Sequence, residues 1–174
     1  RGFANARHEI AVMGDGDLTY DFRKLGELVR PIIAGEAQFV IGNRMGNILP
    51  GAMPPLHRYI GNPVLSGLLR LLFHDRRVRD VHCGLRAISM AAYRQLRCVT
   101  TGMEFASEMV VQAIHTGVVI AQRDIVYHPR VGDSKLQSLR DGWRHLRFLV
   151  LHSPTLLLLL PGAVFCLLGL FMAL

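Results

Sequence analysis

The last twenty residues, TLLLLLPGAVFCLLGLFMAL at 155–174, contain no charged side chain. An apolar helix of about 20 residues is long enough to cross the hydrocarbon core of a bilayer. The alternative is a buried core helix, but a helix that is apolar on every side needs protein all around it, and this chain has only 174 residues. Since Pro161 and Gly162 interrupt the run, we expect a transmembrane or re-entrant helix there.

Positive charge is concentrated just before this apolar run. The net charge is +7, and Lys24 and Lys135 are the only lysines, so arginine supplies most of it. Six basic residues against three aspartates lie between Arg123 and Arg147, an excess that favours the cytoplasmic side of a membrane and suits anionic headgroups or a lipid phosphate. We therefore expect a cell-membrane protein whose catalytic part is cytoplasmic. A nucleic-acid partner is not expected, because no groove-reading motif accompanies the charge.

Cysteine and histidine are scattered along the chain. Cys83, Cys98 and Cys166 form no CxxC pair, which argues against a disulfide framework and against a zinc site. His82, which precedes Cys83, is interpreted as a packing residue rather than a metal ligand.

Alternating strand and helix patterns predict an α/β fold. EIAVMGD is a short buried strand, and a helical repeat of apolar residues follows it, with Asp21 as its cap and Gly35 at its end. AQFVIGN is then a second strand, and a strand-helix-strand unit favours a mostly parallel sheet. A Gly- and Pro-rich loop precedes a helix at about 57–73, in which Pro63 is awkward. Further on we expect a strand or turn at VHCGLRAIS, helices at MAAYRQLR and MEFASEMVVQAIHTG, a strand at VVIAQRDIVY, and an amphipathic segment at about 136–151.

Two aspartates, Asp15 and Asp17, follow the first predicted strand with only Gly16 between them. Side chains alternate along an extended chain, so both carboxylates point to the same side. Carboxylates held close together raise each other's pKa unless a cation relieves them, and hard oxygen ligands suit Mg²⁺ or Mn²⁺ completed by a nucleotide diphosphate. The end of a strand in an α/β sheet is also where ligands bind.

A series of short motifs extends this pattern along the chain. MGDGDLTYDF, FVIGNRM, DVHCGLRAIS, MEFASEM and HPRVGDSK occur in this order ahead of the apolar run. Together they resemble the family 2 glycosyltransferases, in particular the branch of the dolichyl-phosphate mannose and polyprenyl-phosphate sugar synthases. The resemblance implies a GT-A fold, a nucleotide-sugar donor, a divalent metal ion, a polyprenyl phosphate acceptor at the cytoplasmic membrane face, and inversion at the anomeric carbon by in-line attack.

The resemblance also assigns roles to single residues. Asp15 and Asp17 would bind the metal ion and the donor diphosphate, and Asp80 would lie near the donor sugar or the acceptor. Phosphate groups would be bound by Arg44, Arg58, Arg130, Ser134 and Lys135. The resemblance implies no catalytic base, because a phosphate acceptor is already anionic. Glu104 and Glu108, one helical turn apart, are expected to face the solvent rather than act as bases.

The implied domain organisation has three parts. Residues 1–136 would be the C-terminal part of a GT-A domain, 137–154 an amphipathic juxtamembrane segment, and 155–174 the membrane helix. The chain opens RGFANARHE without a counterpart of the family's nucleoside-binding half. We therefore expect the later part of a larger protein, which would bind donor poorly when isolated.

Two other interpretations stay open. DGDLT also fits the DxDxT motif of aspartyl-phosphate phosphatases, in which the first aspartate attacks phosphorus, although that mechanism needs a downstream lysine and a further acidic pair. The second alternative is a non-catalytic, membrane-tethered remnant of a transferase.

Overall fold

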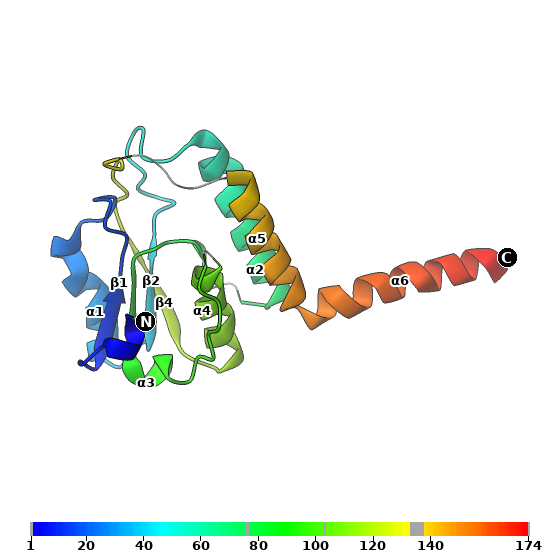
Figure 1. Ribbon diagram of the computed structural model, residues 1–174, viewed down its shortest axis with the longest axis horizontal. Coiled ribbons are helices and arrows are strands. Elements are labelled where there is room, and N and C mark those ends of the chain that lie inside the picture. Colours follow the sequence, from blue (N-terminus) through cyan, green and yellow to red (C-terminus); the bar gives the residue numbers. More distant parts are fainter. Residues whose placement is uncertain (1, 76, 103, 133–137, 174) are drawn as a thin grey trace.

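The computed structural model describes residues 2–75, 77–102, 104–132 and 138–173. A four-stranded sheet is flanked by helices on both faces, with α1 on one side and α2, α4 and α5 on the other (Figure 1). The strands are β1 (Ile10–Met13), β2 (Phe39–Asn43), β3 (Arg86–Ser89) and β4 (Ile120–Asp124). The longer helices are α1 (Leu25–Ile33), α2 (Asn62–Leu72), α4 (Phe105–His115), α5 (Ser138–Leu151) and α6 (Pro154–Ala173), with α3 (Met90–Tyr93) a single turn.

The order of the strands is β1-β3-β2-β4, and this corrects the predicted mostly parallel sheet. β2 and β4 are parallel, but β3 lies between β1 and β2 and runs antiparallel to both. The strand-helix-strand unit therefore exists, yet its two strands are not neighbours. The chain between β2 and β3, with its long loop and α2, is long enough to return a strand in the opposite direction. The α/β class is confirmed, with a mixed sheet.

The middle of the sheet forms the core. Phe39, Val40 and Ile41 of β2 are completely buried, because helices cover both faces of this strand. Leu28 of α1 packs on one face, and Met109 of α4 belongs to the same buried cluster.

Local signals in the sequence place several helix ends correctly. Asp21 accepts a hydrogen bond from the backbone N–H of Arg23 (3.1 Å) and so caps the 3₁₀ turn Phe22–Lys24 that leads into α1. Gly35 follows the end of α1 with a φ of 71°, a conformation that glycine adopts without steric cost. The helix expected at 57–73 begins with a π-helical turn, His57–Gly61, before α2. Pro63 is the second residue of α2, which directly follows this π-helical turn, so it lies near the start of α2 and not in its middle.

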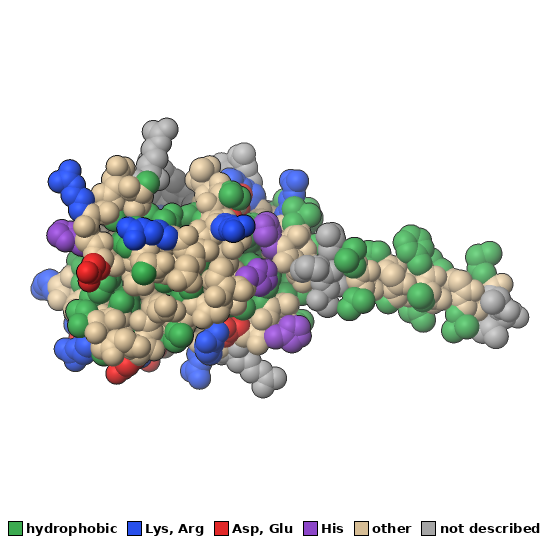
Figure 2. Space-filling view, turned by 90° about the horizontal axis from the view of Figure 1, so that it is seen from below, with side chains coloured by type: hydrophobic (Ala, Val, Ile, Leu, Met, Phe, Trp, Pro, Cys, Tyr) green, Lys and Arg blue, Asp and Glu red, His purple; other side chains and the backbone are tan. Residues whose placement is uncertain are grey.

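The C-terminal apolar run forms α6, which projects away from the rest of the molecule (Figure 1). Pro161 lies inside this helix and does not end it. Apolar side chains project from the helix along its length in Figure 2, and Phe171 and Met172 are 80% and 86% exposed. In the described part of the chain no helix combines the length and the apolar character needed to cross a membrane, so the transmembrane helix expected at 155–174 is not found.

Candidate functional site

The two aspartates lie directly after β1, as the sequence predicts. Asp15 is exposed and makes no hydrogen bond or ion pair with any residue that the structure describes. Its carboxylate lies against Gly84, where a Cβ atom would overlap Asp15 Oδ2 and come within 3.1 Å of Tyr20 Oη. Only glycine therefore fits at this position without displacing the carboxylate.

Asp17 is already engaged by neighbouring side chains. Its Oδ1 accepts hydrogen bonds from the N–H of Thr19 (3.2 Å) and from Thr19 Oγ1 (2.6 Å), and its Oδ2 is 2.7 Å from Arg130 Nε. Partial burial raises the pKa of Asp17, but the hydrogen bonds from Thr19 and the positive charge of Arg130 outweigh it, so the pKa lies below its usual value. Asp17 is therefore a carboxylate at neutral pH.

Arg44 and Asp80 form a buried pair with each other. Asp80 accepts from Arg44 Nε (2.7 Å), Arg44 Nη2 (2.8 Å) and the Arg44 backbone N–H (3.1 Å), and its side chain is fully buried. Burial raises the pKa of Asp80, but its hydrogen bonds with Arg44 and the Arg44 charge outweigh this effect. The pKa of Asp80 therefore lies below its usual value. Asp80 thus holds the Arg44 guanidinium in place through two hydrogen bonds. Its predicted position near the donor sugar or the acceptor stays a prediction.

An aromatic pair connects the Arg44 side of the site to the Asp15 side. The Arg44 guanidinium lies 5.2 Å from the ring centroid of Tyr127, and the rings of Tyr127 and Tyr20 are 5.6 Å apart. Tyr20 Oη accepts a hydrogen bond from the Gly84 N–H (2.9 Å), and burial raises the pKa of this phenol. Tyr20 is therefore neutral and helps to fix the loop against which Asp15 lies.

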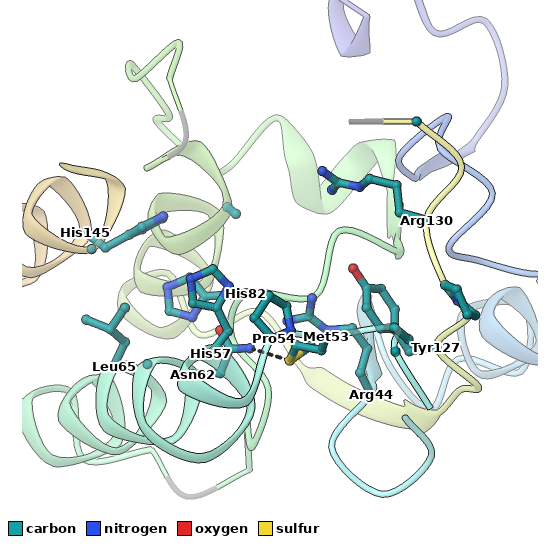
Figure 3. Close-up of a pocket in the computed structure, with 17 residues that line it drawn as sticks. Arg44, Met53, Pro54, His57, Asn62, Leu65, His82, Tyr127, Arg130 and His145 are labelled. Carbon is teal, nitrogen blue, oxygen red and sulfur yellow. Dashed lines mark hydrogen bonds between the residues drawn. The ribbon is translucent and has the colours of Figure 1, made fainter. Parts of the chain in front are cut away.

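A cavity of about 580 Å³ opens beside these residues (Figure 3). Arg44 and Arg130 line it, so two of the predicted phosphate-binding residues contribute to the wall of the same cavity. Its other lining residues come from the loop and the π-helical turn before α2, from α2 itself, from the segment before β3, from α4, from α5 and from the segment after β4: Gly51, Ala52, Met53, Pro54, His57, Gly61, Asn62, Leu65, His82, Ala106, Tyr127, Pro129, Gly132, Gly142 and His145. None of these lining residues is a carboxylate.

The remaining predicted phosphate ligands are placed differently. Arg58 lies in the π-helical turn and rests over the ring of Tyr59, at 5.4 Å, next to the cavity-lining His57 but not itself in the cavity wall. Ser134 and Lys135 lie outside the described residues.

A group of histidines in the cavity wall was missed by the sequence interpretation. Ser107 Oγ of α4 lies 3.3 Å from His82 Nε2 and 3.1 Å from His145 Nδ1 of α5, and the two rings meet edge to face. Burial and the nearby positive charges lower the pKa of His82 to about 3, so its ring is neutral at pH 7. The predicted packing role of His82 is thus combined with a hydrogen bond that joins the segment before β3 to α4, while the bond of His145 to the same hydroxyl joins α5 to α4. No periodic signal indicates such a contact, because its members are far apart in the sequence.

The expectation that Glu104 and Glu108 face the solvent is wrong for Glu108. This side chain is 1% exposed, and it accepts hydrogen bonds from the N–H groups of Val99 and Thr100, both at 2.9 Å, and from Thr100 Oγ1 at 2.6 Å. It therefore closes the loop before α4 and does not reach the cavity. Glu104 is partly exposed and pairs with Arg144 of α5 at 3.0 Å.

The carboxylates at β1 fit a divalent cation that a substrate helps to hold. The described residues contain no group of three or more metal-ligating side chains, so the chain does not form a closed metal cage there. Mg²⁺, however, is usually held by one or two carboxylates together with substrate phosphates. Asp15 can offer its free carboxylate, and Asp17 can offer Oδ2 in competition with Arg130.

The fold is that of the GT-A glycosyltransferases. The structure of glucosyl-3-phosphoglycerate synthase from Mycobacterium tuberculosis matches with a TM-score of 0.65 at 18% identity, over 87% of this chain and 52% of that chain. The same enzyme has been solved with Mn²⁺, uridine diphosphate and glucosyl-3-phosphoglycerate, and this form matches with a TM-score of 0.64. At this level of identity the likeness concerns the fold alone.

Relatives by sequence are glycosyltransferases of Haloferax volcanii. The low-salt glycan biosynthesis hexosyltransferase Agl6 is 44% identical over 161 residues, which is 92% of this chain and 39% of Agl6. The glycosyltransferase AglJ is 29% identical over 133 residues, which is 75% of this chain and 43% of AglJ. The chain thus spans about two fifths of the length of these relatives. No protein-family model matches the sequence.

Proposed function

We propose that the whole protein transfers a sugar from a nucleotide-diphosphate sugar to a polyprenyl (dolichyl-type) phosphate, with inversion, at the cytoplasmic face of the cell membrane. Its cofactor is Mg²⁺ or Mn²⁺, bound by Asp15 and Asp17. The similarity to a hexosyltransferase and the GT-A fold support the transferase part of this proposal. The motifs of the polyprenyl-phosphate sugar synthases support the choice of acceptor.

One structural observation argues most strongly for this function. Arg130 pairs with Asp17 at 2.7 Å and also lines the cavity, so the acidic motif and the cavity are adjacent. A sugar donor bound by its diphosphate at the aspartates would therefore lie beside a cavity with arginines in its wall. This is the arrangement that transfer to an anionic acceptor requires.

The residues of the chain have separable roles in this reaction. The metal ion, when bound, offsets the negative charge that the diphosphate leaving group gains as the bond to the sugar breaks. Arg44 and Arg130 bind the acceptor phosphate, and Asp80 holds Arg44 in a fixed orientation through two guanidinium contacts. The acceptor oxygen is anionic at pH 7, so it attacks without a general base.

Membrane association is part of the proposal. α6 exposes large apolar side chains, including Leu167 at 67% and Phe171 at 80%, which a lipid bilayer would cover. α5 leads into α6 and bears the exposed basic residues Arg144 and Arg147, which suit anionic headgroups on the cytoplasmic side. This position would bring a lipid-linked phosphate to the cavity, which α5 helps to line.

The test is transfer of label from a nucleotide sugar to a lipid fraction by the full-length protein. We expect Asp15→Asn and Asp17→Asn each to reduce metal-dependent transfer at least about 100-fold, since a preorganised electrostatic contact at the leaving group contributes on that scale. Glu36→Gln is the matched control: Glu36 is exposed and lies at 3.7 Å from Arg123, away from the cavity. Undiminished transfer by both asparagine variants would show that the motif is not catalytic. Hydrolysis of a simple phosphomonoester that depends on Asp15 would favour the phosphatase interpretation.

A further inference from the structure

The ion pair between Asp17 and Arg130 uses a side chain that also belongs to the cavity. Arg130 Nε lies 2.7 Å from Asp17 Oδ2, and the two side chains are 27% and 20% exposed, so both remain open to ligands. Figure 3 shows Arg130 extending from the segment after β4, on the same side of the cavity as Tyr127 and Arg44. Arg130 is therefore within reach of two different anionic partners, the Asp17 carboxylate and an anion in the cavity.

A cation at Asp17 would compete with Arg130 for a single oxygen atom. Asp17 Oδ1 already accepts two hydrogen bonds from Thr19, which occupy its lone pairs. Oδ2 is the oxygen that remains, and it faces the Arg130 guanidinium. Two positive groups on one oxygen repel each other, so binding of a divalent ion there displaces Arg130.

The backbone around Arg130 stays fixed when this side chain moves. The His128 N–H donates to the Thr19 carbonyl (3.0 Å), and the Val131 N–H donates to the Asp17 carbonyl (3.1 Å). These two hydrogen bonds hold the segment after β4 to the segment after β1 without help from the ion pair. Displacement of Arg130 is therefore a change of side-chain rotamer, not an opening of the loop.

The other arginine of the cavity does not change partner in this way. Arg44 is paired with Asp80, which is fully buried and is not a predicted metal ligand, so its charge is balanced in every state. Arg130 is balanced only while Asp17 is free of metal. Release of Arg130 thus adds one uncompensated positive charge to the cavity.

We propose that Arg130 exchanges Asp17 for an anion in the cavity when a divalent cation binds at the aspartates. The proposal rests on the proposed function and adds the regulation of the same site: cation binding prepares the cavity for a phosphate-bearing ligand. Because such coupling is reciprocal, phosphate in the cavity must tighten cation binding by the same factor. Metal and donor would then bind before the acceptor.

The experiment measures Mn²⁺ binding to the full chain from the electron paramagnetic resonance signal of free Mn²⁺, with and without inorganic phosphate. The signal is referenced to protein-free samples that contain the same phosphate. We expect phosphate to lower the dissociation constant for Mn²⁺ about fivefold, at the lower end of typical coupling between sites. In the reverse titration, Mg²⁺ should tighten phosphate binding, followed by ³¹P resonance, by the same factor.

Two variants test whether Arg130 competes with the cation for Asp17 or only stabilises the cation site. Arg130→Gln should bind Mn²⁺ more tightly than the unchanged protein in the absence of phosphate, because Asp17 has lost its competing partner, and it should show no dependence on phosphate. Arg123→Gln is the control, since Arg123 is exposed on β4 and pairs with Glu36. It should behave like the unchanged protein.

The outcomes also separate this inference from the proposed function. Mn²⁺ binding that does not respond to phosphate, or that weakens in Arg130→Gln, would overturn the exchange of partners and leave the metal site intact. Failure of the unchanged protein to bind Mn²⁺, with or without phosphate, would instead remove the metal site, and with it both proposals.

Discussion

Arg44 and Asp80 lie 36 residues apart in sequence and meet as a buried ion pair, in which Asp80 is fully buried and Arg44 keeps 8% of its side chain exposed. Taking two charges out of water is costly, and removing one partner leaves the other charge buried without compensation. The pair therefore fixes the position of Arg44 in the cavity wall at an energetic cost that other contacts must offset. Its role in the fold is orientation more than net stability.

We expect Asp80→Asn to lower the free energy of unfolding by about 3–5 kcal/mol, the range found when one partner of a buried pair is lost. Urea-induced unfolding followed by circular dichroism measures this change. Glu36→Gln, which removes an exposed partner of Arg123, should change the free energy of unfolding by less than about 1 kcal/mol. Equal losses in the two variants would mean that the Arg44–Asp80 pair is not desolvated in solution.

The same pair predicts how stability depends on acid. The pKa of Asp80 is lowered in the folded protein, so its contribution is fully present above the unfolded-state value of about 3.9 and is lost as the pH falls through the folded value. Asp80→Asn should therefore flatten the acid limb of the stability profile below about pH 4.

Residues of the site differ in how far the sequence could predict them. Asp15 and Asp17 follow a clear strand, so their place at its end could be deduced from a local pattern. The use of Glu108 to close a loop could not, because a glutamate on a helix looks the same in sequence whether its carboxylate meets water or backbone N–H groups. The bridge from Ser107 to His82 and His145 likewise depends on how separate elements pack.

Among the elements, the strands and main helices are predicted well, but the order of the strands is not. A short continuous apolar run indicates a strand that is covered on both faces, and β2, in which the consecutive residues Phe39 and Val40 are both buried, shows this clearly. Such a run does not report which strand is the neighbour. The placement of β3 between β1 and β2 depends on contacts between residues far apart in the chain, such as the pairing of Val12 with Ala87.

The loop before α4 offers a test at the scale of elements. Glu108→Gln keeps the shape of the side chain but replaces one of the two oxygens that accept from backbone N–H groups with an NH₂ group, which cannot accept. We expect a loss of about 2–3 kcal/mol in the free energy of unfolding, because hydrogen bonds to a charged group contribute about 1.5–3 kcal/mol each. Thermal unfolding provides the measurement.

Glu104→Gln is the matched control for Glu108→Gln. Glu104 lies one turn earlier and pairs with the partly exposed Arg144, so its loss should cost less than about 1 kcal/mol. If the two variants were equally stable, the buried position of Glu108 would be wrong.

At the scale of the whole molecule, the projecting α6 is the feature that the globular part does not explain. Its exposed apolar side chains have no covering partner in the described structure. Flotation with vesicles that contain anionic lipid tests whether a bilayer covers α6. We expect the full chain to float with the vesicles and a chain ending at Ser153 to remain behind. The near-ultraviolet circular dichroism of the shorter chain should be unchanged. A full chain that stays dispersed without detergent or lipid would contradict membrane association.

Diffraction from the intact protein with Mn²⁺ and a nucleoside diphosphate addresses the metal site most directly. We predict an anomalous manganese peak within coordination distance of carboxylate oxygens of both Asp15 and Asp17, bridged to the diphosphate, with Arg130 turned into the cavity. A peak elsewhere, or two carboxylates that point apart with no metal between them, would contradict the proposed chemistry.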